Sequence, residues 1–229
     1  LDHALRPASV AVIGASAEPG SLGRKLTDNI LGGGFGGEIY LVNPRRAKIG
    51  RRPCYPDVAS LPETPELAVI ATPPPTVPDL IGALAAKGTR AAVVITAGLS
   101  QELKQAALDQ AKRCCLRIIG PNCLGIAVPQ IGLQAHFSLT SPSPGKLAFL
   151  SQSGALVTGI LDWAAARGIG FSYVVSMGDM ADVDIGDLLD FLAADVATGA
   201  ILVYLETIPA ARKFMSAARS AARAKPVIV

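Results

Sequence analysis

Short apolar runs recur along the chain, and segments with a helical pattern separate them. The first five runs are rich in β-branched residues and lie at Val10–Gly14, Ile39–Val42, Leu67–Ala71, Ala91–Thr96 and Leu116–Ile119. Nearly every position in these runs is apolar, which is typical of strands that are buried on both faces of a parallel sheet. Ala- and Leu-rich segments at 22–32, 76–87 and 100–113 predict helices between them. This alternation predicts a doubly wound α/β fold.

A second α/β series follows a break in this pattern. Prolines and glycines between residues 128 and 144 bracket a stretch without periodicity, which predicts an irregular connection between two domains. We expect strands at 146–150, 171–175, 200–205 and 227–229, and helices at 153–167, 184–194 and 208–223. The predicted domains are therefore 1–127 and 145–229, joined by 128–144. Because the series ends on a strand without a covering helix, we expect the second domain to be cut short.

The composition excludes several classes of protein. Half of the residues are hydrophobic, 17% are charged and the net charge is +3, which excludes a disordered chain. Four cysteines, two of them adjacent, suit a reduced cytoplasmic protein better than a disulfide scaffold. No apolar run approaches the roughly 18–20 residues that span a bilayer, and no secretory signal is visible, so we expect no membrane partner. With 5% aromatic residues and little net charge, we expect no nucleic-acid partner either.

A small-residue loop follows the first predicted strand and leads into a helix. This loop spans residues 14–23 and reads Gly-Ala-Ser-Ala-Glu-Pro-Gly-Ser-Leu-Gly. Small residues allow a ligand to approach the backbone, and the N–H groups at the start of the helix suit a phosphate. The spacing departs from G-x-G-x-x-G, so it is weak evidence for a dinucleotide.

The second predicted strand ends in cations where an NAD site would carry a carboxylate. Val42-Asn43-Pro44-Arg45-Arg46 opens a basic stretch that continues to Arg52. Because this strand end has cations and no acid, it favours a nucleotide with an extra phosphate on its ribose. Both NADP and coenzyme A carry such a phosphate. The alternative is an ordinary turn beside a solvated basic loop.

Further candidate residues follow the other predicted strands of the first domain. The third strand ends at Thr72-Pro73, the fourth at Ala97-Gly98, and the fifth leads into Gly120-Pro121-Asn122-Cys123. These loops share the carboxyl edge of a parallel sheet, where nucleotides bind. Cys123 is a poor candidate nucleophile, because no base lies near it in the sequence.

The second domain offers an anion site and a carboxylate. Ser151-Gln152-Ser153-Gly154 follows a strand and opens a helix, where hydroxyl and N–H groups can hold a phosphate or simply cap the helix. The segment is not a nucleophile elbow, since Ser151 stands where that motif has Gly. Glu206 ends a strand, where it can orient a cationic or imidazole partner or remain an ordinary exposed residue. His136 lies in the connection and is expected to be structural. We expect no metal site in the chain.

Taken together, these motifs resemble those of the NDP-forming acyl-CoA synthetases, which include ADP-forming acetate–CoA ligases and the succinyl-CoA synthetase α subunit. The elements that carry the resemblance are 12–23, Val42-Asn43-Pro44, Ile119-Gly120-Pro121-Asn122-Cys123-x-Gly125 and Ser151-Gln152-Ser153-Gly154-Ala155. Residues 160–229 look closest to a branch in which this region is fused to a GNAT protein lysine acetyltransferase. The resemblance implies a Rossmann-like CoA-binding domain followed by a truncated flavodoxin-like, succinyl-CoA ligase-like domain.

The resemblance also implies roles for the candidate residues. Coenzyme A or acetyl-CoA would be held through the loop residues and the neighbouring turns, namely Gly14, Ala15, Ser16, Pro19, Ser21, Gly23, Asn43, Arg45, Thr72, Pro73, Ala97, Gly98, Asn122 and Cys123. A phosphate would be bound by Ser151, Ser153 and Gly154. Glu206 would orient a phosphohistidine that shuttles phosphoryl groups.

One departure from the family pattern limits what this chain does alone. The phosphohistidine of the family lies beyond the strand at 226–229, and neither His3 nor His136 matches it. The ATP-grasp domain or subunit that binds ATP and Mg is a partner outside this chain, and an oligomer is expected. Three functions follow: part of an acid–CoA ligase, an acyl-CoA-sensing module of a GNAT acetyltransferase, or an NADP-dependent oxidoreductase. The oxidoreductase lacks a recognisable set of residues for hydride transfer.

Overall fold

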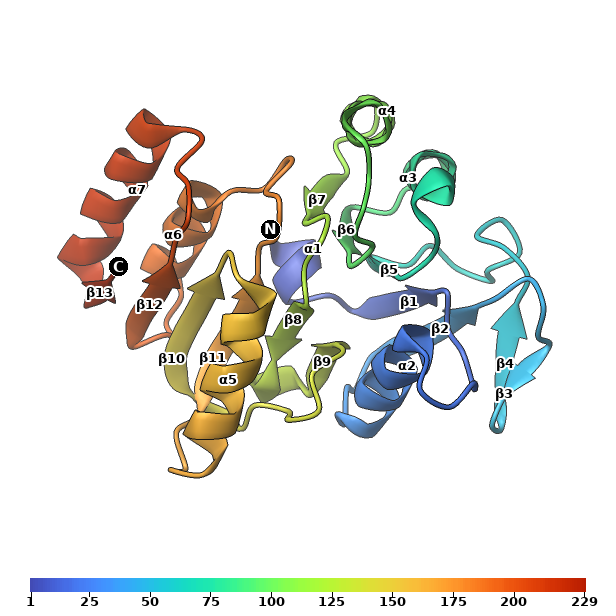
Figure 1. Ribbon diagram of the computed structural model, residues 1–229, viewed down its shortest axis with the longest axis horizontal. Coiled ribbons are helices and arrows are strands. Elements are labelled where there is room, and N and C mark those ends of the chain that lie inside the picture. The colour runs from blue at the N-terminus through green and yellow to red at the C-terminus, as the bar shows by residue number, and fades with distance from the viewer.

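The strands of the first domain form one sheet, seen on the right of Figure 1 in a computed structural model that describes residues 1–229. The order of its strands is β3-β4-β2-β1-β5-β6-β7. Their bounds are β1 Ser9–Ile13, β2 Glu38–Val42, β3 Lys48–Ile49, β4 Arg52–Tyr55, β5 Leu67–Ile70, β6 Ala91–Val94 and β7 Arg117–Ile119. All neighbouring strands are parallel except β3 and β4, which form a small antiparallel hairpin at the edge. This arrangement confirms the predicted doubly wound α/β fold.

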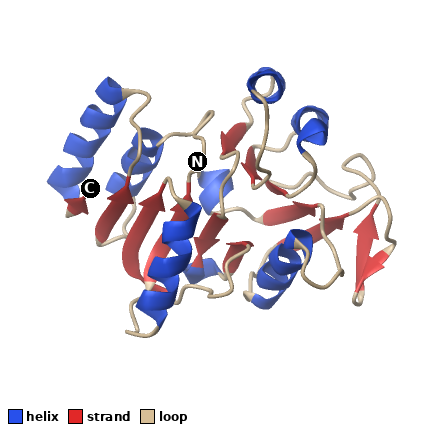
Figure 2. Cartoon of the chain, in the orientation of Figure 1, coloured by secondary structure: helices blue, strands red, loops and turns tan.

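Helices cover both faces of this sheet (Figure 2). Their bounds are α1 Asp2–Leu5, α2 Leu22–Gly32, α3 Val77–Lys87 and α4 Gln101–Lys112, and a short 3-10 turn, η1 Pro74–Thr76, precedes α3. Buried side chains of α3 and α4 pack on one face, while α1 and α2 pack on the other. The side chains of Ser21 and Ser100 cap α2 and α4, which is why these helices begin where they do.

The second sheet has the order β13-β12-β10-β11-β8-β9. The strands are β8 Gly125–Val128, β9 Leu133–His136, β10 Pro144–Ser151, β11 Phe171–Ser176, β12 Ala200–Tyr204 and β13 Val227–Ile228. The helices are α5 Gly154–Ala165, α6 Ile185–Ala194 and α7 Ala211–Ala224. Helix α5 packs on one face of the sheet and helices α6 and α7 on the other. None of the helices in the chain combines the length and apolar composition needed to cross a bilayer.

The segment expected to be an irregular connection contains regular structure, so that prediction was wrong. Strands β8 and β9 pair antiparallel around the 3-10 turn η2 Pro129–Ile131, and β8 adds this hairpin to β11 of the second sheet. Every residue of both strands is buried, so the hairpin has no alternation of apolar and polar positions. Whether the domains divide at residues 127 and 145 stays a prediction.

The two sheets share one core. The largest cluster of buried side chains contains Val10 and Val12 of β1 together with Ile126 of β8 and Leu150 of β10. At Gly33, which ends α2, an ideal Cβ would lie 2.4 Å from the carbonyl oxygen of Gly132 in the hairpin. The first domain therefore packs directly against the second.

A buried carboxylate joins the N-terminal segment to the second sheet. Asp195, which follows α6, accepts hydrogen bonds from the Arg6 guanidinium and, at 2.6 Å, from the Thr198 hydroxyl. Its side chain is only 2% exposed. Burial by itself raises the pKa of Asp195, but the bonds from Thr198 and Arg6 outweigh burial and lower this pKa below its ordinary value.

Replacing Asp195 with Asn tests this connection. Asp195→Asn should lower the free energy of unfolding near pH 7 by about 1–3 kcal/mol, because Arg6 and Thr198 lose a charged acceptor. Since the pKa is lowered on folding, the carboxylate stabilises the fold above its unfolded pKa of about 3.9, and this stabilisation is lost as the pH falls through the folded value. The free energies of unfolding of the variant and the wild type, measured with urea, should therefore become equal at acidic pH. Asp190→Asn, at an exposed position of α6, is the control, and an equal effect of both variants would contradict the assignment.

Candidate functional site

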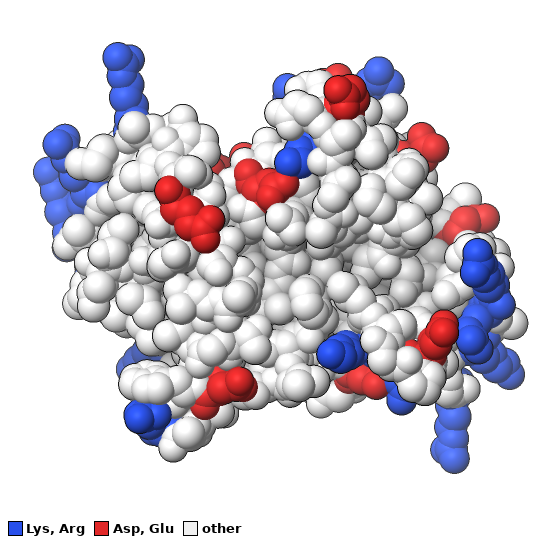
Figure 3. Space-filling view, viewed as in Figure 1, with Lys and Arg blue, Asp and Glu red and all other residues white.

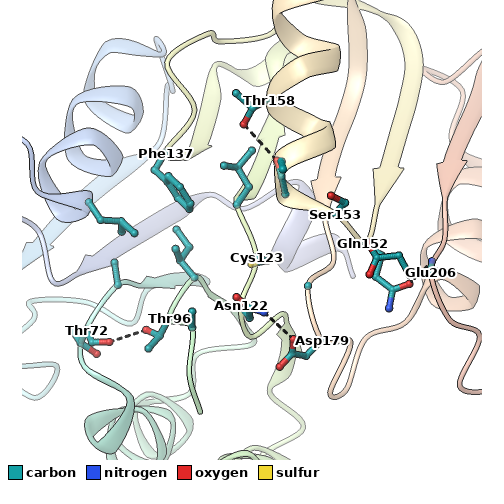
Figure 4. A pocket seen from close by; sticks show the side chains of 18 residues that line it. Thr72, Thr96, Asn122, Cys123, Phe137, Gln152, Ser153, Thr158, Asp179 and Glu206 are labelled. Atoms are coloured by element: carbon teal, nitrogen blue, oxygen red, sulfur yellow. Dashed lines mark hydrogen bonds between the residues drawn. The ribbon is translucent and has the colours of Figure 1, made fainter.

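Two hollows meet at the carboxyl edge of the first sheet. The first, called the groove here, has a volume of about 490 Å³ and is lined by residues that include Gly14, Asn43, Arg45 and Pro73. The second, called the cavity, has a volume of about 740 Å³ and lies between the two domains (Figure 4). Both hollows are lined by Ala71 and Thr72, so the groove and the cavity lie next to each other at this edge of the sheet.

Close backbone contacts shape the loop that follows β1. Gly14 has φ +91°, and an ideal Cβ on it would lie 2.4 Å from the carbonyl oxygen of Ala71. A Cβ on Gly23, in the first turn of α2, would lie 2.2 Å from the carbonyl oxygen of Gly14. Only glycine allows both approaches. They bring the start of α2, with its unpaired N–H groups, next to the wall of the groove.

Polar side chains of this region hold the loop in place. The Asn43 side chain donates to the carbonyl oxygen of Ala15 at 2.8 Å and accepts from the N–H of Arg45 at 2.8 Å. The Ser16 hydroxyl accepts from the N–H of Glu18, and the Ser21 hydroxyl donates to the carbonyl oxygen of the same residue. These three side chains therefore fix the shape of the loop, and the N–H groups of Gly14 and Ala15 are also bonded within the protein, to the carbonyl oxygen of Val42.

Arg45 supplies the positive charge of the groove. Its side chain is exposed and forms no ion pair with another side chain of the chain. The other cations of the basic stretch, such as Lys48 and Arg52, belong to the exposed β3–β4 hairpin outside the groove. In Figure 3 the basic side chains gather toward the two ends of the molecule, and the middle of this face carries few of them. Because it has no partner, Arg45 can bind an anion without breaking an existing pair.

The turn after β7 forms the wall of the cavity on the first-domain side. Asn122 has φ +60°, and its side-chain amide donates to Asp179 at 3.1 Å. Asp179 belongs to the second domain and pairs with Lys104 of α4. The Cys123 thiol is 4% exposed and donates to the carbonyl oxygen of Val94 at 3.4 Å, and burial raises its pKa to about 12. A buried thiol that keeps its proton does not act as a nucleophile.

The start of α5 faces this turn from the second domain. The Ser153 hydroxyl caps the helix by accepting from the N–H of Leu156 at 3.3 Å. Ser151 is fully buried, and its hydroxyl donates to the carbonyl oxygen of Ser153 at 2.8 Å, so Ser151 shapes the turn from behind. Ser153 and Gly154 line the cavity, where the first N–H groups of α5 lack acceptors within the helix.

Gln152 holds Glu206 at the edge of the cavity. Its side-chain oxygen accepts from the N–H groups of Glu206 and Thr207, at 2.8 and 3.0 Å, and its amide donates to the Thr207 hydroxyl at 2.9 Å. Figure 4 shows the side chains of Gln152 and Glu206 side by side, next to Ser153. A carboxylate therefore lies beside the start of a helix within one cavity.

The structure separates the predicted site residues into three groups. The groove is lined by Gly14, Asn43, Arg45, Thr72 and Pro73, and the cavity by Thr72, Ala97, Asn122, Cys123, Ser153, Gly154 and Glu206. Neither hollow is lined by Ala15, Ser16, Pro19, Ser21, Gly23, Gly98 or Ser151, which support the lining loops from behind or lie beside them. Sequence reasoning missed Gln152, Asp179 and Phe137 as lining residues. The position of Gln152 within the Ser-Gln-Ser-Gly motif was the one sequence feature that could have predicted it as a lining residue.

Comparison with protein families assigns both halves of the chain. Residues 8–129 match the family described as CoA binding domain, and residues 144–229 match the succinyl-CoA ligase like flavodoxin domain. The chain belongs to the NDP-forming acyl-CoA synthetases.

Known members of the NDP-forming acyl-CoA synthetases align with the whole chain. The acetate–CoA ligase (ADP-forming) I of Archaeoglobus fulgidus is 40% identical over 100% of this chain and 34% of its own length. The α subunit of the corresponding Pyrococcus furiosus enzyme is 37% identical over 100% of this chain and 52% of its own. The chain thus spans about a third to a half of these relatives. Fusion to an acetyltransferase stays a prediction.

A solved structure of the same family has nearly the same fold. The dinucleotide forming acetyl-coenzyme A synthetase 1 of Ca. Korarchaeum cryptofilum, in complex with phosphate and ADP, superposes with a TM-score of 0.95. It is 36% identical, and the match covers 99% of this chain and 50% of that one. The Rossmann-like and flavodoxin-like domains expected from the sequence are therefore both present.

Alkylation of the cysteines tests the state of Cys123. Cys114 and Cys115 are exposed, so iodoacetamide near pH 8 should modify both in the folded chain. Cys123 should remain unmodified, because its thiol is buried and its pKa is raised to about 12. Peptide mass mapping with and without urea measures the difference. Modification of Cys123 in the folded chain, as fast as that of Cys114, would show that the thiol is accessible and reactive.

Proposed function

We propose that the chain is the CoA-binding and ligase-core part of an NDP-forming acid–CoA ligase. The complete enzyme would convert an acid such as acetate, CoA and ATP into acyl-CoA, ADP and phosphate. One observation carries this proposal, namely that the groove containing Arg45 lies next to the cavity that holds the start of α5 and Glu206, with Thr72 in the lining of both. This arrangement would let the nucleotide part of CoA bind in the groove while its thiol reaches the phosphate site in the cavity.

The groove suits the nucleotide end of CoA. Its volume of about 490 Å³ lies within the range of small-molecule sites. The unpaired cation of Arg45 would bind the phosphate on the ribose, and the backbone of the loop after Gly14 would face the pyrophosphate. Thr72 and Pro73 also line the groove, next to Gly14. Because Asp57 lines the groove as well, the local contact with Arg45 rather than the net charge of the lining would hold the polyanionic nucleotide.

The thiol arm would extend from the groove into the cavity. Thr72 lines both hollows, so an arm that passes it would lie along Ala97 and end near Asn122 and Cys123. There the CoA sulfur would attack the carbonyl carbon of an acyl phosphate. A carbon–sulfur bond forms, the bond between that carbon and the phosphate oxygen breaks, and phosphate leaves with the electron pair. The thiol proton is lost to solvent or to phosphate.

The start of α5 would hold the phosphate of this reaction. The N–H groups after Ser153 and the positive end of the helix dipole both favour an anion. Glu206 would orient the phosphohistidine, which lies outside this chain, while Gln152 positions Glu206. ATP and Mg would be bound by an ATP-grasp partner. An acyl-CoA sensor would use the same groove, so its distinguishing feature would be the absence of phosphoryl transfer.

Calorimetric titration with CoA tests the groove. The wild-type chain should bind CoA and not NADP. Gly14→Val should weaken CoA binding at least about tenfold, because its Cβ meets the carbonyl of Ala71 and changes the loop. Arg45→Glu should weaken binding more in about 10 mM salt than in about 1 M salt, where the Debye length falls from about 30 to 3 Å.

A matched charge reversal controls for long-range electrostatics. Arg51→Glu changes the same charge on the exposed β3–β4 hairpin, outside the groove, and should have a much smaller effect than Arg45→Glu. Equal effects of the two reversals would show that Arg45 makes no local contact. Unchanged affinity in both Gly14→Val and Arg45→Glu would remove the proposed site.

A phosphorylation experiment tests whether a histidine of this chain takes the role of the family's phosphohistidine. The imidazole of His136 is 2% exposed, accepts from the N–H of Ser138 and contacts Gln134, and burial lowers its pKa to about 4. Incubation with acetyl phosphate or ATP should therefore leave no phosphohistidine, detected as alkali-stable, acid-labile phosphate. A label that disappears in His136→Asn would overturn the structural role given to His136.

A further inference from the structure

The β3–β4 hairpin, residues 46–55, and the position before it carry a dense group of unpaired positive charges. Five cations occur among the eight residues 45–52, and no Asp or Glu occurs between positions 39 and 56. Five of the 21 Lys and Arg residues thus lie here, and the others stand against 18 Asp and Glu, which leaves the rest of the chain with a net charge of −2. The five side chains are exposed and form no ion pair, namely Arg45, Arg46, Lys48, Arg51 and Arg52.

Both ends of this hairpin join the lining of the groove. Arg45 lines the groove just before the hairpin begins, and Pro56 and Asp57 line it just after the hairpin ends. The hairpin is anchored to the first sheet at this place, because the N–H of Asn43 donates to the carbonyl oxygen of Tyr55 at 2.9 Å and β4 pairs with β2. The hairpin therefore holds its cations next to the groove, although they do not line it.

The linings of the two hollows provide no net positive charge. The charged residues that line the groove are Arg45 and Asp57, whose charges cancel. Those that line the cavity are Asp179 and Glu206, which are both carboxylates. A contact with Arg45 can hold a phosphate that has arrived, but a neutral lining does not attract one over a distance. Long-range attraction of a polyanion to the groove therefore has to come from cations outside the lining, and those of the β3–β4 hairpin adjoin it.

We propose that the β3–β4 hairpin attracts the polyanionic nucleotide of CoA to the groove and so raises its rate of association. This inference rests on the proposed function and adds to it the surface that CoA approaches first. Electrostatic attraction of this kind raises association rates about 10- to 1,000-fold, and the effect falls steeply with ionic strength. Because the cations of the hairpin do not line the groove, they stabilise the approaching and the bound nucleotide about equally. The rate of dissociation therefore depends little on them.

Binding kinetics of a triple variant test the proposal. Lys48→Glu, Arg51→Glu and Arg52→Glu together reverse three charges of the hairpin and leave Arg45 in place. Stopped-flow mixing with fluorescent etheno-CoA measures association, and displacement by unlabelled CoA measures dissociation. In about 10 mM salt the variant should associate about tenfold more slowly than the wild type, with a dissociation rate within about twofold. In about 1 M salt, where the Debye length is about 3 Å, the two association rates should become equal, which also shows that the variant is folded.

A matched variant separates the hairpin from the net charge of the chain. Arg212, Arg219 and Arg223 of α7 are also exposed and without ion pairs, and α7 lies at the opposite end of the molecule (Figure 1). Replacing all three with Glu changes the net charge by the same amount and should slow association less than about twofold in about 10 mM salt. Dephospho-CoA has about two fewer negative charges than CoA, so the hairpin variant should slow its association less.

Four results would overturn the proposal. An unchanged association rate of the hairpin variant in about 10 mM salt, while CoA still binds, would exclude attraction by the hairpin and leave the proposed function standing. Equal slowing by the α7 variant would assign the effect to net charge alone. A loss of affinity that arises from faster dissociation would show direct contact of the hairpin with bound CoA. Failure of the wild-type chain to bind CoA at all would overturn this inference and the proposed function together.

Discussion

The cavity depends on a close approach of two backbone turns that belong to different sheets. Gly178, after β11, has φ +55°, and an ideal Cβ on it would lie 2.2 Å from the carbonyl oxygen of Pro121. The N–H of Asp179 donates to the same oxygen at 2.9 Å, and its carboxylate joins Asn122 to Lys104. Since a side chain at position 178 would push the turns apart, a single glycine sets the distance between the two walls of the cavity.

Most polar side chains near the two hollows maintain the shape of the loops that line them. Asn43 fixes the loop after β1, Ser151 supports the turn before α5, and Gln152 holds the strand end that carries Glu206. A polar group that already has a partner costs little to bury, whereas an unpaired one is expensive. At the start of α5, which lines the cavity, N–H groups remain without acceptors in the helix, and such groups suit a phosphate.

The β8–β9 hairpin shows how tertiary packing determines what a sequence pattern leaves open. Helix α2 of the first domain contacts this hairpin, and the side chain of Asn29 donates to the carbonyl oxygens of His136 and Ser138. Polar residues such as Gln134 and His136 are buried there because they bond to each other at 2.9 Å. Without an exposed face, the strands show no alternation, and their polar residues suggest a loop instead.

The sequence by itself determined the central parallel strands and the main helices. Apolar runs place those strands, and Ser21 and Ser153 begin two helices, because these features depend on residues close together in the chain. Only the tertiary structure decided which side chains face one another. Gln152 is hydrogen-bonded to Glu206, 54 positions away in the sequence, and Asn122 to Asp179, 57 positions away. A periodic pattern of neighbouring residues cannot predict pairs so far apart. The cavity likewise exists only once two sheets share a core, since its walls come from both domains.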